Sequence, residues 1–167
     1  MVFLFIFHPK LKHMDEDGFD FSEEEKEELG KEMRKENEKL QKHPLLKQAK
    51  EVLAIVDALL DSCSNETREV YGSTLRESAM IVVAKLHSGL ASDNYVLCMQ
   101  KAAIIREHGE YLRLSNHLLS SSGAFDEKYV ALFRQEVENF RLLFKDWARK
   151  IHQMENDLED EWGLFSN

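Results

Sequence analysis

The chain has 167 residues and a net charge of −9, with only 2 Pro, 7 Gly and 2 Cys. This length favours a single domain, and the 43% of hydrophobic residues excludes wholesale disorder. No apolar run is long enough for a transmembrane helix, and the acidic balance argues against a protein whose whole surface binds nucleic acid.

The distribution of proline predicts the fold class. Both prolines, Pro9 and Pro44, lie in the first 44 residues. Proline removes an amide donor and clashes with the preceding helical turn, so its absence from the rest of the chain favours long helices. Together with 32% charged residues, this pattern predicts an all-α protein.

Residues 1–43 form an acidic N-terminal segment that we expect to be poorly ordered or weakly docked. The apolar run Met1–Phe7 precedes its positive charges, the reverse of a secretory signal. We expect Met14 to be the true start and residues 1–13 not to be native; the alternative is a short membrane or partner anchor. Ser22 and Glu25 form a capping box, which predicts an extra acidic helix over 22–42, interrupted near Gly30.

The spacing of apolar residues over 44–158 predicts four helices, at about 44–63, 66–91, 94–122 and 126–158. Pro44 suits a first helical position, Asn65, Asp93 and Asp126 are expected caps, and Gly123 is a C-terminal stop. The connections are so short that consecutive helices must run antiparallel. The expected architecture is therefore an antiparallel up-down-up-down four-helix bundle, preceded by the acidic helix.

The third of these helices carries two neighbouring columns of apolar residues spaced by seven. One column is Leu97, Ile104, Tyr111 and Leu118, and the other is Cys98, Ile105, Leu112 and Leu119. The fourth helix has similar columns, which begin at Phe133 and Val137. Such spacing is typical of helices that pack along their length, so we expect these columns to face the core. Gly109 interrupts the third helix, which predicts a close approach by another backbone.

No known catalytic or metal-binding motif is present. Helical di-iron sites need Glu-x-x-His, and no acidic residue stands three before a histidine of these four helices. We therefore predict no metal and no cofactor. Cys63 and Cys98 form no CxxC pair and lie on apolar stripes, which favours packing roles in a reducing compartment and hence a cytoplasmic protein.

Four charged residues are expected at similar heights on three helices: Arg76, Glu77, Glu110 and Glu136. They could form a ligand or metal site, or an ion-pair layer that sets the register of the helices. We favour the structural interpretation, because facing charges in a core need partners.

Two further features could mediate interactions. A basic stripe follows one side of the fourth helix, at Arg134, Arg141, Lys145 and Arg149, although a solvated polar face is the simpler explanation. The acidic and aromatic tail over 159–167 contains Trp162, Leu164 and Phe165. It could enter a groove on a partner or a second copy, or fold back onto its own helices.

Two stretches carry a family resemblance. Residues 75–89, LRESAMIVVAKLHSG, and residues 94–119, NYVLCMQKAAIIREHGEYLRLSNHLL, resemble the second and third helices of a bacterial four-helix-bundle family. That family includes proteins encoded in 23S ribosomal RNA intervening sequences and accessory variability proteins of diversity-generating retroelements. The resemblance implies a homo-oligomer and, in the retroelement branch, a basic surface that binds nucleic acid and a reverse transcriptase.

The charge of this chain departs from that branch. Residues 45–167 hold 14 Lys and Arg against 19 Asp and Glu, and phosphate binding depends on Lys and Arg. The sequence therefore predicts a non-enzymatic helical scaffold or protein-interaction module that self-associates. The alternatives are a nucleic-acid-binding accessory protein and a ligand-binding or enzymatic bundle.

Overall fold

The computed structural model describes residues 22–154, 160 and 163–164, and this part of the chain is helical without strands. The prediction of an all-α protein is confirmed. The five helices are α1 (Glu23–Gln41), α2 (Pro44–Ser62), α3 (Asn65–Leu90), α4 (Tyr95–Ser122) and α5 (Glu127–Ile151). None of these five has the length and apolarity that a membrane span requires.

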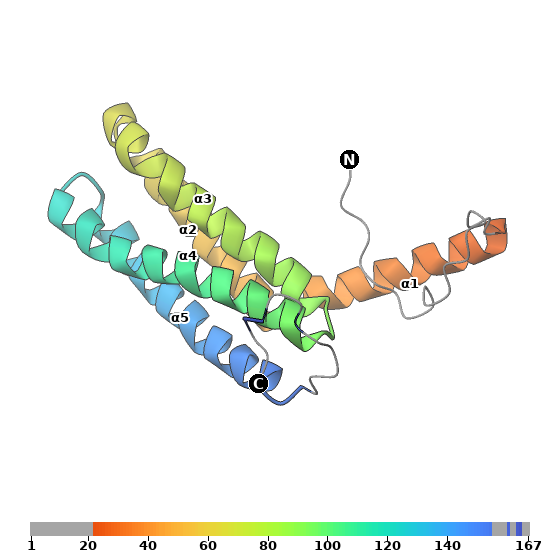
Figure 1. Cartoon of the computed structure of the whole chain (residues 1–167). Helices are drawn as coiled ribbons and strands as arrows, with labels where there is room; N and C mark the ends of the chain where they lie inside the picture. Colours follow the sequence, from red (N-terminus) through yellow and green to blue (C-terminus); the bar gives the residue numbers. More distant parts are fainter. Residues whose placement is uncertain (1–21, 155–159, 161–162, 165–167) are drawn as a thin grey trace.

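Helices α2 to α5 pack together around one apolar core (Figure 1). Each packs against the next along the chain, and α5 also packs against α2, which closes the ring. Figure 1 shows the chain reversing direction at each short connection. The core combines aliphatic side chains of α2 and α3 with aromatic side chains of α5, among them Phe133, Phe140 and Trp147.

Side-chain caps explain where the helices begin. The oxygen of Asp126 accepts a hydrogen bond from the amide of Lys128, as expected. The other two expected caps are each displaced by one residue. Ser64, not Asn65, caps α3, and Asn94, not Asp93, caps α4. At the far end of α4, Gly123 takes the left-handed conformation at φ 62°, which favours glycine.

Helix α1 projects away from the other helices and has no buried residue. It packs mainly against the neighbouring α2, and Oδ1 of Asn37 also lies 3.4 Å from Nε2 of His87 on α3. The expected interruption near Gly30 is wrong, because α1 is continuous from Glu23 to Gln41. The capping box at Ser22 and the ion pair between Lys31 and Glu27 stabilise the helix and offset the low helix propensity of glycine.

Helix α5 ends at Ile151, well before the expected residue 158. The amides of Gln153 and Met154 bond to carbonyls three residues earlier, which tightens the chain into a turn. At this level Lys150 lies close enough to His43, the cap of α2, to act on its charge. Helix α2 begins at this level, so any continuation of α5 beyond it would have no part of α2 to pack against. Leu158, from the expected column, lies outside the described residues.

Only one of the two apolar columns of α4 is in the core. Cys98, Ile105, Leu112 and Leu119 are all buried. In the other column, Leu97, Tyr111 and Leu118 are exposed and Ile104 is half-buried. The expectation that both columns face the core is therefore wrong. The core seam of α4 instead includes Ala102, Gly109 and Asn116, and Gly109 leaves room for the ring of Phe140 on α5.

Candidate interaction surfaces

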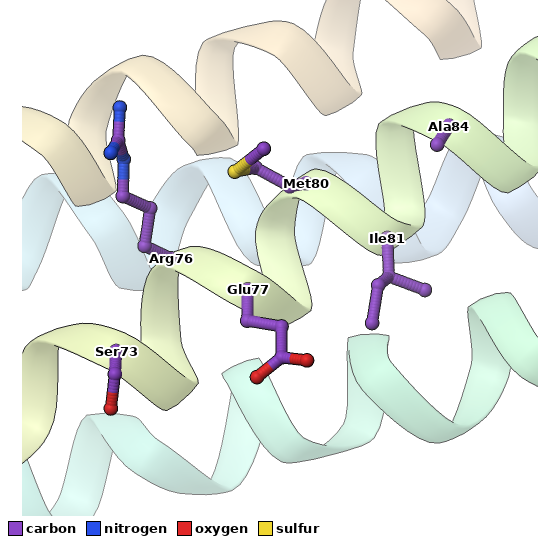
Figure 2. A pocket seen from close by; sticks show the side chains of 6 residues that line it. All are labelled: Ser73, Arg76, Glu77, Met80, Ile81 and Ala84. Atoms are coloured by element: carbon purple, nitrogen blue, oxygen red, sulfur yellow. The ribbon is translucent and has the colours of Figure 1, made fainter.

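The four charged residues expected in one layer have separate neighbours. Arg76 of α3 donates from Nε to Oδ1 of Asp57 on α2, over 2.8 Å. Glu77, the next residue, is exposed and points toward α4 instead (Figure 2). Glu110 pairs with Arg113 on its own helix. The structure therefore brings no two of Arg76, Glu77 and Glu110 into contact.

Glu136, the fourth of them, links α5 to α2. Gln48 of α2 donates from Nε2 to Oε2 of Glu136 over 2.5 Å and to the Glu136 carbonyl oxygen over 3.2 Å. Asn139 donates to the same carboxylate over 3.2 Å. These hydrogen bonds satisfy a half-buried carboxylate and fix the register of two helices, a structural role.

Two polar side chains interrupt the core side of α4. His108 Nδ1 lies 3.2 Å from Ser78 Oγ on α3, so these residues stand at the same level. Asn116 donates to the carbonyl of Arg113 over 3.3 Å, but its buried Oδ1 has no hydrogen-bond partner. His108 thus has a polar partner, whereas Asn116 is only partly satisfied.

The cysteines have packing roles. Cys98 is buried, and its Sγ donates weakly to the carbonyls of Gly89 and Ser92. Burial raises the pKa of the Cys98 thiol, which disfavours the reactive thiolate. Cys63 is half-buried and packs against the core, and neither cysteine forms a disulfide. Among the described residues no group of three or more His, Cys, Asp or Glu could hold a metal ion.

Two ion pairs, one on α4 and one on α5, lie within electrostatic reach of each other. Arg113 binds Glu110 through two hydrogen bonds of 2.9 and 2.6 Å, and Arg141 binds Glu138 in the same way at 2.8 and 2.6 Å. These bonds lower the pKa of each glutamate and raise the pKa of each arginine. The two pairs also act on each other from one helix to the next, since Arg141 favours the charged form of Glu110.

The basic stripe expected on α5 is thus largely engaged by neighbours. Arg134 donates to Ser120 of α4 over 3.0 Å, and Arg149 pairs with Asp146 over 2.6 Å. Lys145 is exposed beside these pairs and favours the charged form of Glu138. Because carboxylates accompany most of these cations, this side of α5 presents mixed charge rather than a positive field.

An apolar surface covers the outer side of α3 and α4, and we call it the α3–α4 face. Its members on α4 are exposed or half-buried: Leu97, Ile104, Tyr111, Leu114 and Leu118. Its members on α3 are Met80, Ile81 and Ala84. Ser78 of α3 contacts His108 of α4. Ile81 lies three residues after Ser78, and Tyr111 lies three residues after His108. Residues three apart share a helix face, so Ile81 and Tyr111 lie on neighbouring helices beside this contact.

A shallow depression of about 420 Å³ opens on the α3 part of this face. Met80, Ile81 and Ala84 line it together with Ser73, Arg76 and Glu77, which lie toward one end (Figure 2). This surface was not expected from the sequence, because the column that begins at Leu97 was predicted to face the core. The two columns could have been distinguished by asking which of them belongs to a continuous stripe of residues at alternating spacings of three and four.

The C-terminal tail is described only in part. Asp160 is buried, and its carbonyl accepts a hydrogen bond from the amide of Gly163. Leu164 is 75% exposed. The burial of Asp160 indicates that the chain packs against the protein at that residue. Leu164 is exposed and could contact a partner. Trp162 and Phe165 lie outside the described residues.

Comparison of the chain with protein families, curated proteins and solved structures finds no match in any of the three. The functional inference therefore depends on these surfaces alone.

Proposed function

We propose that the chain is a non-enzymatic helical interaction module, an antiparallel four-helix bundle of α2–α5 that carries α1 as an extra acidic helix. The observation that supports this most is the α3–α4 face. Four apolar residues on it recur every seven positions along α4, over about 32 Å. A repeated apolar column on the surface of a helix is typical of a seam for another helix.

Several polar groups of the described residues have structural explanations, which supports binding over catalysis. Glu136 is held by Gln48 and Asn139, Arg76 by Asp57, and His108 by Ser78. The buried thiol of Cys98 is kept protonated by a raised pKa. A catalytic centre would bring such groups together in a concave site.

Sedimentation velocity across a wide range of protein concentrations tests the proposal. It should be combined with binding of a labelled synthetic helix that has a leucine stripe flanked by glutamine. We expect either self-association or peptide binding, and we expect Leu114→Ser with Leu118→Ser to abolish it. A chain that stays monomeric at every concentration and binds no such helix would overturn the proposal.

Nucleic-acid binding, which the family resemblance implies, is the less favoured function. Arg141 and Arg149 are each paired with a carboxylate, and counterion release needs cations that can reach phosphates. A mobility-shift assay at low salt separates the two functions. Binding that is lost on Arg134→Ala with Lys145→Ala would favour the nucleic-acid function instead.

A further inference from the structure

The charges on the α3–α4 face restrict the kind of partner that it can hold. This inference rests on the interaction function proposed above. Glu107 lies three residues after Ile104 and four before Tyr111, so it shares their face of α4. Glu77 lies four residues before Ile81 and borders the depression on α3. Both glutamates are exposed.

The two glutamates lie at similar heights on neighbouring helices, near the middle of the face. Ser78 and His108 are in contact at 3.2 Å, and Glu77 and Glu107 are the residues immediately before them. Glu107 is also midway along the column from Leu97 to Leu118. The middle of the apolar surface therefore carries one exposed negative charge from each helix, and a bound partner must either neutralise these charges or avoid them.

The other charged residues are distributed unevenly along the length of the face. Glu66 and Glu69 are exposed in the first turns of α3, and this end of α3 lies at the same end of the packed helices as the C-terminal end of α4. Lys85 and Lys101 are half-buried and lie toward the Leu97 end. The negative potential therefore extends from the middle of the face to the Leu118 end.

A second copy of this chain fits this face poorly. In a twofold dimer each residue near the axis approaches its own copy. A dimer centred on this face would place Glu77 and Glu107 against the same glutamates of the other copy. Like charges that face each other across an interface oppose binding and exclude partners of that kind.

We propose that the α3–α4 face binds an amphipathic helix of a different protein, whose apolar stripe is flanked by Lys and Arg. The stripe packs along Ile104, Tyr111 and Leu114, and the cations lie over Glu77 and Glu107. Helix-in-groove recognition of this kind uses apolar anchors for affinity and flanking charge for specificity.

Three labelled synthetic helices of about 18 residues, or about 27 Å, test this on the full chain. All carry the same leucine stripe, and their flanks are lysine, glutamine or glutamate. Fluorescence anisotropy at low salt should show the lysine helix binding at least about tenfold more tightly than the glutamate helix. Glu77→Lys with Glu107→Lys should reverse that order.

A matched control separates this face from general surface apolarity. Leu114 on the face and Leu142 on α5 are each 51% exposed. Leu114→Ser should weaken binding of all three helices, whereas Leu142→Ser should leave it unchanged. Circular dichroism confirms that each variant keeps its helical content.

The outcomes distinguish this inference from the proposed function. If all three helices bind equally and Leu114→Ser weakens each, the interaction function stands and the inference about cations is overturned. A dimer that Leu114→Ser disperses would also overturn the inference while supporting the function. If no helix binds and the chain is monomeric, both are overturned.

Discussion

Two glycines in the packed helices should respond in opposite ways to substitution by alanine. A Cβ atom at Gly89 of α3 would lie 3.1 Å from Cη2 and 3.2 Å from Cζ2 of Trp147, and 3.3 Å from Cβ of Lys101. Carbon atoms that are not bonded prefer separations of about 3.5–4.0 Å. Trp147 is a rigid, buried ring that reaches Gly89 from α5, so it has little room to move.

The expected magnitude for Gly89→Ala combines two opposing terms. Overpacking a core typically costs about 1–3 kcal/mol. Alanine gains up to ~1 kcal/mol over glycine inside a helix, but Gly89 stands one residue before the end of α3, where this gain is smaller. We therefore expect a net loss of about 1 kcal/mol in the free energy of unfolding.

Gly109 is the matched control for this prediction. It lies in the interior of α4, and an added Cβ would meet Cε1 of Phe140 at 3.6 Å, an ordinary contact. Gly109→Ala should therefore stabilise the protein by about 0.4–1 kcal/mol. The close approach by another backbone that the sequence predicts at Gly109 is therefore wrong, because its neighbour is the ring of Phe140, and the tighter contact is that of the Trp147 side chain with Gly89.

Urea unfolding followed by circular dichroism measures both variants. The two should differ by about 2 kcal/mol, which for a chain of this size separates their Tm values by about 4–8 °C. The reasoning is refuted if Gly89→Ala is as stable as the wild type or more stable, or if Gly109→Ala is destabilised.

Three further predictions concern the core, a histidine cap and helix α1. Phe133→Ala, at a fully buried position, should lower the free energy of unfolding by about 3–5 kcal/mol in the same assay, and a loss below 1 kcal/mol would contradict the core assignment. Burial and Lys150 lower the pKa of His43 in the folded chain, so the unfolded chain binds more protons at this residue. The free energy of unfolding should therefore fall as the pH drops from neutral through the lowered pKa. His43→Asn keeps a cap without this titration and should flatten that part of the pH profile of urea unfolding; an unchanged profile would refute the assignment. Deletion of residues 1–35 should shift the Tm by no more than about 2 °C in a thermal melt, since α1 buries no residue, and a larger loss would show that α1 is docked.

Local signals in the sequence predicted where most helices begin and end. The caps and the left-handed glycine act within a few residues, so their effect can be read without the rest of the fold. The end of α5 could not be predicted in this way. Its apolar column continues to Leu158 in the sequence, but α5 ends where α2 begins, and that limit depends on tertiary packing.

The polar layer shows a second limit of prediction from sequence. Counting residues from helix ends gives the height of a side chain along a helix, but not the direction in which it points. Arg76 and Glu77 are adjacent in height, yet a rotation of about 100° per residue sends Arg76 toward α2 and Glu77 toward α4. Height alone therefore could not tell a shared site from separate surface contacts.

The rotation of α4 connects this limit to the proposed function. A helix in a packed bundle needs two adjacent columns in an alternating three-four spacing. On α4 the residues that complete this spacing are Cys98, Ala102, Ile105, Gly109, Leu112, Asn116 and Leu119. Gly109 among them leaves room for the ring of Phe140 on α5, and α4 turns its second apolar column outward. That column is not needed to complete the core seam of α4, and a partner helix along the α3–α4 face would explain why it is apolar.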